Sequence, residues 1–179
     1  FNLNKDNKII GFQVRALENT GGPKYKTWNL ERIYDRLKKP LNVSEDELDS
    51  LNKISMIFGI LTVNLGREFT IFEGPIDSFF MSNTLGLTGV KKQILDFDEI
   101  PTARYMFDND YEGKAKMMQK LKKGQTVFMW DKYLKDFNIP KKKVKDLNDL
   151  IKYEYSKRTG CLQEVDKYFT NNHLDLIFL

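Results

Sequence analysis

Three short apolar runs, each followed by polar or turn-forming residues, restrict the fold of this chain more than any other feature. They are residues 69–72, 103–107 and 126–130, and the first two stop abruptly at Glu73-Gly74-Pro75 and at Asp108-Asn109-Asp110. Short runs rich in β-branched and aromatic residues predict buried strands. Helical patterns lie between them. An alternation of strands and helices predicts an α/β fold with a mostly parallel central sheet flanked by helices.

A helix is predicted upstream of these runs. Ser44 and Glu47 have the spacing of a capping box, in which each side chain bonds the backbone N–H of the other. Apolar residues then recur on one face as far as Phe58, and Gly59 is the expected stop.

Three further segments have a recognisable pattern. Residues 8–17 predict a strand with β-branched and aromatic content, and residues 90–97 predict a helix. Residues 111–123 predict a Lys-rich amphipathic helix that Gly124 closes.

The composition excludes several classes of protein. The 179 residues are 41% hydrophobic, which suffices for one domain or two small subdomains that share a core. Cys161 is the single cysteine, so no internal disulfide can form, and with one histidine, His173, a Cys/His zinc site is not expected. No apolar run approaches the roughly 18 residues of a membrane helix. We expect a cytoplasmic location, and the start at Phe1 indicates a piece of a longer protein.

Positive charge is concentrated near the start of the chain. The formal net charge is +4 and the pI is about 9.0. Residues 5–39 contain nine Lys or Arg against four Asp or Glu, an excess of five positive charges. A basic excess of this kind suits a polyanionic partner.

Acidic residues follow two of the predicted strands. In open α/β sheets, ligands bind beyond the carboxyl ends of the strands, so Glu73, Asp108 and Asp110 would meet there if their strands are neighbours. Carboxylate oxygens suit Mg²⁺ or Mn²⁺, and three like charges in one place normally need a cation. Taken singly, the Asp-Asn-Asp and Glu-Gly-Pro motifs are more often solvated turns than metal sites, and it is their occurrence together at two strand ends that indicates a site.

These motifs resemble the signatures of the Toprim domain. Residues 72–77, Phe-Glu-Gly-Pro-Ile-Asp, resemble its E-G-x-x-D motif, and residues 108–115 resemble its D-x-D-x-x-G-x-x-A motif. Residues 145–149, Lys-Asp-Leu-Asn-Asp, resemble the K-D-x-D or K-D-x-N-[ED] motif that follows in primases. The resemblance covers about residues 66–150.

The upstream half of the chain indicates which family of Toprim enzymes the sequence resembles. Residues 11–15, Gly-Phe-Gln-Val-Arg, and residues 23–26, Pro-Lys-Tyr-Lys, resemble the G-F-x-x-R and P-K-Y elements of bacterial replicative primases. Residues 76–80 and 128–130 are closer to the primases of large tailed bacteriophages. The chain therefore resembles a Toprim-type DNA primase.

The resemblance implies a domain organisation and an activity. Residues 1–65 would form a basic α+β N-terminal subdomain, residues 66–150 the Toprim catalytic subdomain and residues 151–179 a C-terminal helical extension. The implied activity is synthesis of RNA primers on single-stranded DNA, in which a 3′-hydroxyl attacks the α-phosphate of an NTP and pyrophosphate leaves. Two Mg²⁺ or Mn²⁺ ions would hold the attacking and leaving oxygens in line.

The resemblance also assigns residues and partners. The implied catalytic residues and primary metal ligands are Glu73, Asp108 and Asp110. The second-tier metal ligands are Asp77 and Asp146. Asn148 stands where bacterial enzymes have a second aspartate, so Asp146 is a better ligand candidate than Asn148. The implied contacts to triphosphate or template are Arg15, Lys24 and Lys26. Partners would be single-stranded DNA, NTPs, a replicative helicase and a zinc-binding module outside this chain, in the host cytoplasm if a phage encodes the protein.

Other Toprim activities remain open at this point, because a fold does not fix a function. A nuclease would use similar carboxylates to hydrolyse DNA. A topoisomerase would need a nucleophilic Tyr in a separate DNA-binding domain, and nothing in the sequence suggests one. A catalytically inactive, nucleic-acid-binding Toprim module would not need the acids, so the presence of Glu73, Asp108 and Asp110 argues against it.

Overall fold

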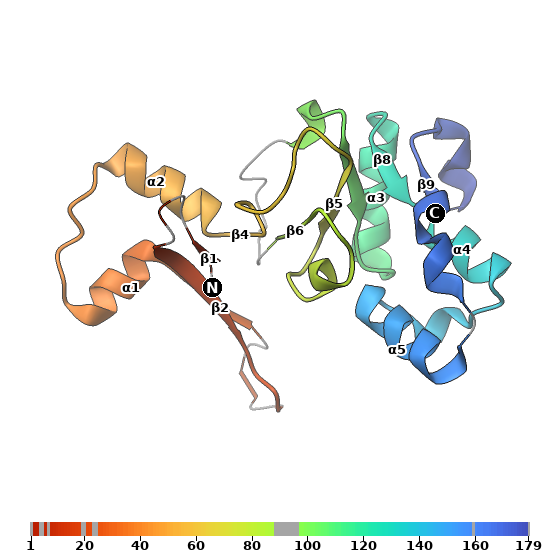
Figure 1. Cartoon of the computed structure of the whole chain (residues 1–179), viewed down its shortest axis with the longest axis horizontal. Coiled ribbons are helices and arrows are strands. Elements are labelled where there is room, and N and C mark those ends of the chain that lie inside the picture. Colours follow the sequence, from red (N-terminus) through yellow and green to blue (C-terminus); the bar gives the residue numbers. More distant parts are fainter. Residues whose placement is uncertain are drawn as a thin grey trace.

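Two β-sheets lie in different halves of the molecule (Figure 1). The computed structural model describes residues 2–3, 6, 8–18, 21–22, 25–87, 97–158 and 160–178. The smaller sheet is antiparallel in the order β1-β2-β3, with strands β1 (Asn2–Leu3), β2 (Ile9–Arg15) and β3 (Tyr25–Asn29).

The larger sheet has six strands in the order β4-β6-β5-β7-β8-β9. Its strands are β4 (Ile57–Phe58), β5 (Phe69–Phe72), β6 (Thr84–Leu87), β7 (Ala103–Met106), β8 (Thr126–Phe128) and β9 (Phe169–Thr170). The inner four strands run parallel, while β4 and β9 pair antiparallel at the two edges. The predicted α/β class with a mostly parallel sheet flanked by helices is confirmed.

Helices connect the strands and flank the larger sheet. The α-helices are α1 (Leu30–Leu37), α2 (Glu45–Ile54), α3 (Tyr111–Lys122), α4 (Trp130–Asp136) and α5 (Leu147–Lys157). The 3₁₀ helices are η1 (Asp77–Phe80), η2 (Phe97–Glu99), η3 (Lys141–Lys143), η4 (Cys161–Tyr168) and η5 (His173–Phe178). None of the helices in the described segments is long and apolar enough to cross a membrane.

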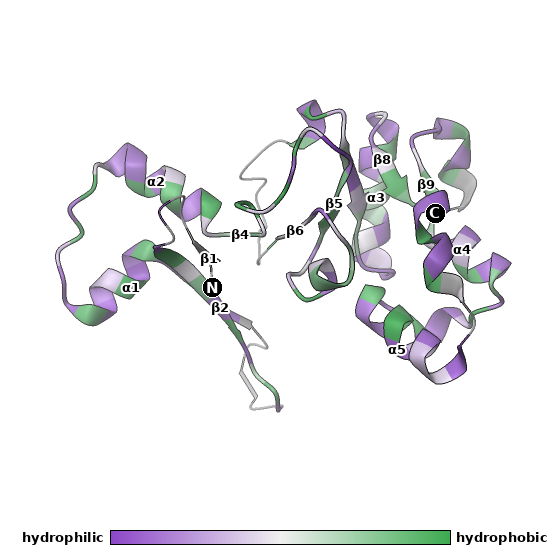
Figure 2. Ribbon diagram, viewed as in Figure 1, coloured by the Kyte–Doolittle hydropathy of each residue, from purple (hydrophilic) through white to green (hydrophobic). Residues whose placement is uncertain are grey.

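The hydrophobic core lies in the half built on the six-stranded sheet. All four residues of β5 are buried, since the strand is covered on both faces. Strand β8 of the same sheet is coloured as hydrophobic in Figure 2. Met117 and Leu121 of α3 pack into the same core. The buried Trp130 donates its indole N–H to the Phe107 carbonyl at 2.8 Å, so its one polar group is satisfied.

The other half has a thin core. Ile10 and Leu30 are its largest buried side chains among the described residues, and α2 has no buried residue. Gly11 allows this half to pack tightly, because a Cβ there would lie 2.9 Å from Ser55 Cβ and 2.9 Å from the Trp28 carbonyl oxygen.

Most of the predicted elements are present near their expected positions. The run 69–72 forms β5, the run 103–107 forms β7 with a one-residue difference, and 111–123 forms α3. Gly124, with φ of +77°, ends α3 as expected. Ser44 caps α2 by accepting the N–H of Glu47 at 3.2 Å.

Three details differ from the predictions. The helix that Ser44 begins ends at Ile54, and Phe58 belongs to strand β4, so Gly59 follows a strand and is not a helix stop. Trp130 starts α4 and does not extend the run 126–130 as a strand. The helix predicted over 90–97 falls on residues 90–96, which lie outside the described residues, and on Phe97, which begins η2.

Candidate active site

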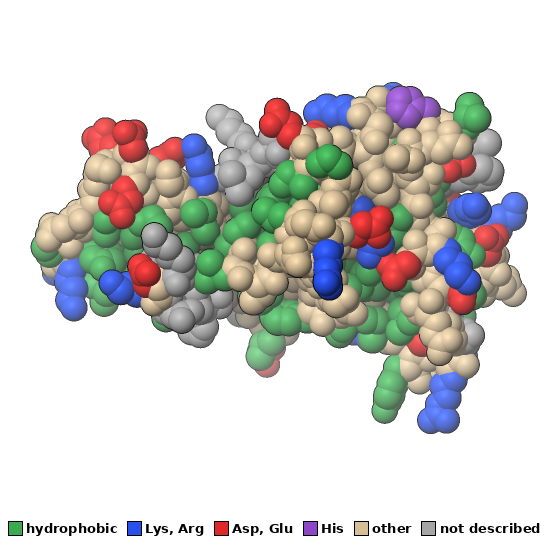
Figure 3. Space-filling model, turned by 45° about the horizontal axis from the view of Figure 1, so that its top comes forward, with side chains coloured by type: hydrophobic (Ala, Val, Ile, Leu, Met, Phe, Trp, Pro, Cys, Tyr) green, Lys and Arg blue, Asp and Glu red, His purple; other side chains and the backbone are tan. Residues whose placement is uncertain are grey.

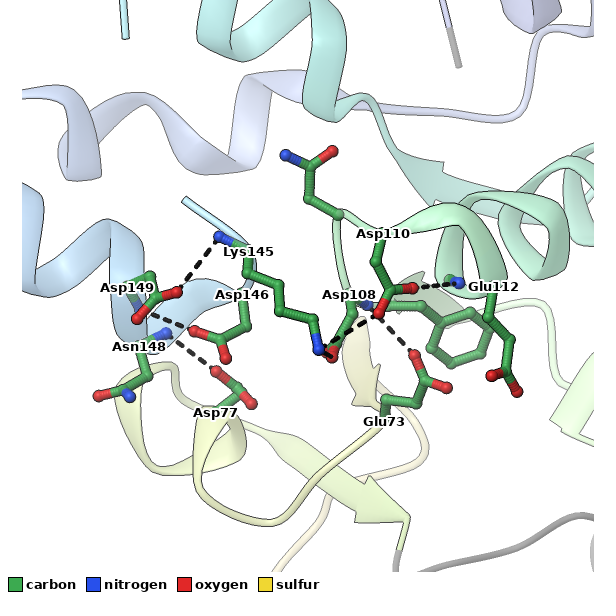
Figure 4. A network of polar contacts seen from close by, with 12 residues as sticks. Glu73, Asp77, Asp108, Asp110, Glu112, Lys145, Asp146, Asn148 and Asp149 are labelled. Carbon is green, nitrogen blue, oxygen red and sulfur yellow. Dashed lines mark hydrogen bonds and ion pairs between the residues drawn. The ribbon is translucent and has the colours of Figure 1, made fainter. Parts of the chain in front are cut away.

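The parallel arrangement of β5 and β7 brings Glu73 and Asp108 together. The two strands are direct neighbours, with Phe72 opposite Met106, so both chains leave the sheet at the same edge. The backbone N–H of Asp108 donates to Glu73 Oε2 at 3.3 Å (Figure 4). The prediction that these two carboxylates would meet beyond neighbouring strands is therefore correct in its geometry.

Asp110 is fixed as the N-cap of α3. Its Oδ1 accepts the backbone N–H of Gly113 at 2.9 Å. This hydrogen bond is the main reason that the pKa of Asp110 lies below its usual value. Gly113 is needed because a Cβ there would lie 2.1 Å from the Asp108 carbonyl oxygen. The D-x-D-x-x-G spacing thus sets how closely α3 approaches the acidic turn.

The surroundings of Asp108 disfavour its charged form. Burial and the nearby Glu73 carboxylate raise the pKa of Asp108 to about 7, although Lys145 acts in the opposite direction. The charges of Asp146 and Asp77 raise it further. The carboxylates of Glu73, Asp77 and Asp146 therefore lie close enough to Asp108 to disfavour its charged form.

Two lysines sit on this acidic cluster. Lys145 Nζ lies 3.3 Å from Asp110 Oδ2 and 3.6 Å from Asp108 Oδ2 (Figure 4). Lys116 of α3 forms an ion pair with Glu73. Acidic and basic side chains also lie close together elsewhere on the surface of this half of the molecule (Figure 3).

Asn109, between the two aspartates, ties the acidic turn to the segment that carries Lys145. Its backbone N–H donates to the Lys145 carbonyl at 2.6 Å, and its side-chain Nδ2 donates to the Val144 carbonyl at 2.9 Å. Asn109 is buried, so these hydrogen bonds are shielded from competing water.

Asp77 and Asp146 meet at the N-terminus of α5. Asp146 is the N-cap and accepts the N–H of Asp149 at 2.7 Å, while Asp77 of η1 accepts the N–H of Asn148 at 2.9 Å (Figure 4). Burial raises the pKa of Asp77 to about 6, and the neighbouring Asp146 charge adds to the increase, while the bond from Asn148 lowers it. Both second-tier residues therefore have a structural task besides any role as ligands.

The basic residues predicted to contact substrate lie on the other sheet. Arg15 ends β2 and Lys26 lies in β3, and both are exposed. Arg15 is opposite Tyr25 and Lys26 is opposite Val14, so alternation along the strands directs Arg15 and Lys26 to opposite faces. Lys24 lies outside the described residues.

The donor set suits a hard divalent cation. Glu73, Asp108 and Asp110 offer only carboxylate oxygens, the ligands that Mg²⁺ and Mn²⁺ prefer, and burial together with the Glu73 charge raises the pKa of Asp108. No group of three or more Asp, Glu, His or Cys in the described part of the chain is already arranged to hold a metal ion. In this arrangement Lys116 and Lys145 supply the positive charge.

Sequence reasoning did not select Lys145, Lys116 or Asn109 as site residues. Lys145 opens the Lys-Asp-Leu-Asn-Asp motif, so its position next to the candidate ligand Asp146 was a usable signal. Nothing in the pattern marks Lys116 or Asn109, because their roles depend on partners 35 to 43 residues away.

Comparison with known proteins supports the assignment that the motifs suggested. No family model matches the chain. A DNA primase of Enterobacteria phage T4 is 27% identical over 175 residues, which are 94% of this chain and 41% of that protein. The chain therefore spans about two fifths of the length of this relative. The predicted resemblance to phage-type primases is confirmed along nearly the whole chain.

Proposed function

We propose that this chain is the catalytic core of a DNA primase, which synthesises RNA primers from NTPs on a single-stranded DNA template. One observation carries the proposal. Glu73 and Asp108 leave neighbouring parallel strands side by side, with Asp110 on the same turn as Asp108. A relative that is a phage DNA primase aligns with 94% of the chain and supports this choice among enzymes with similar carboxylates.

We further propose that the sheet is a Toprim fold. The motifs over residues 66–150 and the parallel order of β6, β5, β7 and β8 support it. In this division residues 1–65 are the basic N-terminal subdomain and residues 151–179 the C-terminal extension. Strand β9, which pairs with β8, would then attach the extension to the sheet edge.

Glu73, Asp108 and Asp110 would hold the first cation, with Asp77 and Asp146 as candidates for a second. Bound Mg²⁺ or Mn²⁺ would neutralise the triphosphate charge and lower the pKa of the attacking 3′-hydroxyl. The chain's own contribution is to fix the carboxylates before substrate arrives. Asp110 is held by Gly113, and Glu73 by the N–H of Asp108. Preorganised charge of this kind needs little rearrangement during the reaction.

Template and triphosphate would be bound by positive charge and by exposed aromatic rings. Arg15, Lys24 and Lys26 are the proposed phosphate contacts. Tyr111, which follows Asp110, is 92% exposed, and Phe79, two residues after Asp77, is 67% exposed. Exposed rings beside a catalytic site suit stacking on unpaired bases.

A replicative helicase and a separate zinc-binding module are the proposed partners, in the cytoplasm of the host.

A single assay tests the function. The purified chain is incubated with single-stranded DNA, Mg²⁺ or Mn²⁺ and labelled NTPs. We expect oligoribonucleotides from the wild type and at least a 100-fold loss in Glu73→Gln, Asp108→Asn and Asp110→Asn, with unchanged folding. The matched control is Glu99→Gln, an exposed acid in η2, which should keep full activity.

The assay also separates the alternatives. Cleavage of the DNA without RNA synthesis would make the chain a nuclease. Template binding with neither product would make it an inactive nucleic-acid-binding module. Near-wild-type synthesis by any of the three variants would remove that residue from the essential ligands.

A further inference from the structure

We propose that Lys145 competes with divalent cations for Asp108 and Asp110, so that its side chain must leave before a metal ion can bind. The inference rests on the proposed function in that it concerns the same acidic site. It adds a role for a residue that no motif identifies as a ligand.

The backbone of Lys145 is held in place from both sides. Its N–H donates to Asp149 Oδ2 at 3.3 Å, and its carbonyl accepts the N–H of Asn109 at 2.6 Å. The preceding carbonyl, of Val144, accepts the buried Asn109 side chain at 2.9 Å. Asn109 therefore fixes the backbone position of Lys145. From this position the Lys145 ammonium reaches the carboxylates of both Asp108 and Asp110.

The Lys145 side chain, in contrast, lies near the surface. It is 59% exposed, while the side chain of Asp108 is 27% exposed. An ammonium is a point charge on a flexible stem, and a surface ion pair is individually weak. The side chain can thus balance the carboxylates in the metal-free protein and still leave at a small cost in free energy.

Lys145 and a divalent cation cannot occupy the same oxygens together. The ammonium lies 3.3 Å from Asp110 Oδ2 and 3.6 Å from Asp108 Oδ2. A Mg²⁺ ion would need such oxygens at about 2.0–2.1 Å. The two cations would then be close neighbours with strong mutual repulsion. Binding of one requires departure of the other.

Lys116 is a weaker competitor by the same reasoning. It pairs with Glu73, but it also lies 3.1 Å from the exposed Glu112, four residues earlier in α3. Glu112 would keep Lys116 neutralised if a metal took Glu73. Among the described residues, Lys145 is the cation that bridges the two aspartates of the D-x-D turn.

The test is the affinity of the metal-free chain for Mn²⁺, measured by electron paramagnetic resonance of the free ion. We expect Lys145→Ala to bind Mn²⁺ roughly three- to tenfold more tightly than the wild type, as the loss of two partly exposed ion pairs predicts. Lys145→Arg, which keeps the charge, should remain within about twofold of the wild type. Alanine preserves the backbone hydrogen bonds of residue 145, so folding should not change.

Lys152→Ala is the matched control. Lys152 lies in α5, is 66% exposed and pairs with Asp149 at 3.2 Å, so its removal changes the net charge equally without touching Asp108 or Asp110. It should alter the Mn²⁺ affinity by less than twofold. Equal tightening in both variants would mean a general charge effect and would overturn the proposal, as would unchanged or weaker binding in Lys145→Ala.

Asp108→Asn distinguishes this inference from the proposed function. If Asp108→Asn loses Mn²⁺ binding while Lys145→Ala leaves it unchanged, the metal site stands and only the role of Lys145 is wrong. If neither the wild type nor Lys145→Ala binds Mn²⁺, both the metal site and the competition are excluded.

Discussion

Asp77 Oδ1 accepts the backbone N–H of Asn148 at 2.9 Å, which links two motifs 71 residues apart in the sequence. The bond joins the end of the E-G-x-x-D motif to the first turn of α5. Asp77 is buried, so the bond lies where a lost acceptor is not replaced easily by water. The acidic site and the fold therefore depend on the same carboxyl group.

We expect Asp77→Asn to be more stable than Asp77→Ala by about 1–2 kcal/mol, because only asparagine keeps an acceptor for the α5 N-terminus. Both variants lack the buried charge, so their difference isolates the hydrogen bond. Chemical unfolding at pH 8 in EDTA would measure it. Equal stabilities would show that Asp77 has no structural role. If Asp77→Asn is the more stable of the two, it is the better variant for testing metal binding, because it removes the charge and keeps the hydrogen bond.

Gly113→Ala should displace the acidic turn. The added Cβ would lie 2.1 Å from the Asp108 carbonyl oxygen, which belongs to the backbone and cannot rotate away. We expect a loss of about 1–3 kcal/mol in the free energy of unfolding, and a loss of primer synthesis beyond what the unfolded fraction explains. Gln119→Ala, an exposed position in the same helix, is the control and should leave both unchanged. Full activity of Gly113→Ala would mean that the turn tolerates movement.

The raised pKa of Asp108 predicts a pH-dependent stability. Between the usual value of 3.8 and about 7, the folded protein holds more protons at Asp108 than the unfolded chain does. The contribution of Asp108 to stability is therefore complete below about pH 3.8 and is lost as the pH rises through 7. Asp108→Asn should gain on the order of 1–2 kcal/mol over the wild type at pH 8 in EDTA, and nothing at pH 4. A constant difference between pH 4 and pH 8 would contradict this assignment.

The strands that carry the acidic residues could be predicted because their sequence signal is local. Phe69–Phe72 and Ala103–Met106 are apolar and end at turn residues. Strand β6, Thr84–Leu87, was not predicted, because four residues that include a glycine give no periodic signal. Gly86 is there for a long-range reason, since a Cβ would lie 2.5 Å from Pro75 Cα.

The charge balance of the site could not be predicted in the same way. The sequence has 29 Lys and Arg residues, and nothing local shows which of them reach the carboxylates. Lys116 meets Glu73 because α3 returns antiparallel to β7 along the sheet, and Lys145 meets Asp110 because Asn109 holds its backbone. Both pairings follow from packing between distant segments. Residue spacing alone does not encode them.

Arg104 should hold the C-terminal segment to the sheet. Its side chain is 12% exposed, its Nε donates to Thr70 Oγ1 at 2.7 Å, and one terminal nitrogen lies 2.7 Å from Asp166 Oδ1. The guanidinium also lies over the Phe169 ring, 4.2 Å from its centroid. A planar, multivalent group of this kind has no equivalent in lysine.

We expect Arg104→Lys to cost about 1–3 kcal/mol in the free energy of unfolding and Arg104→Ala at least as much, because Thr70 is fully buried and would lose its donor. Limited proteolysis should then cut first within residues 160–178, before the rest of the sheet opens. Lys167→Ala removes an exposed ion pair to Glu164 from the same segment and should change neither measurement. Arg104 is on β7 but away from the carboxyl end that carries Asp108, so primer synthesis per folded molecule should persist in Arg104→Lys. Early cleavage at other positions, with 160–178 still protected, would mean that β9 pairing alone holds the segment.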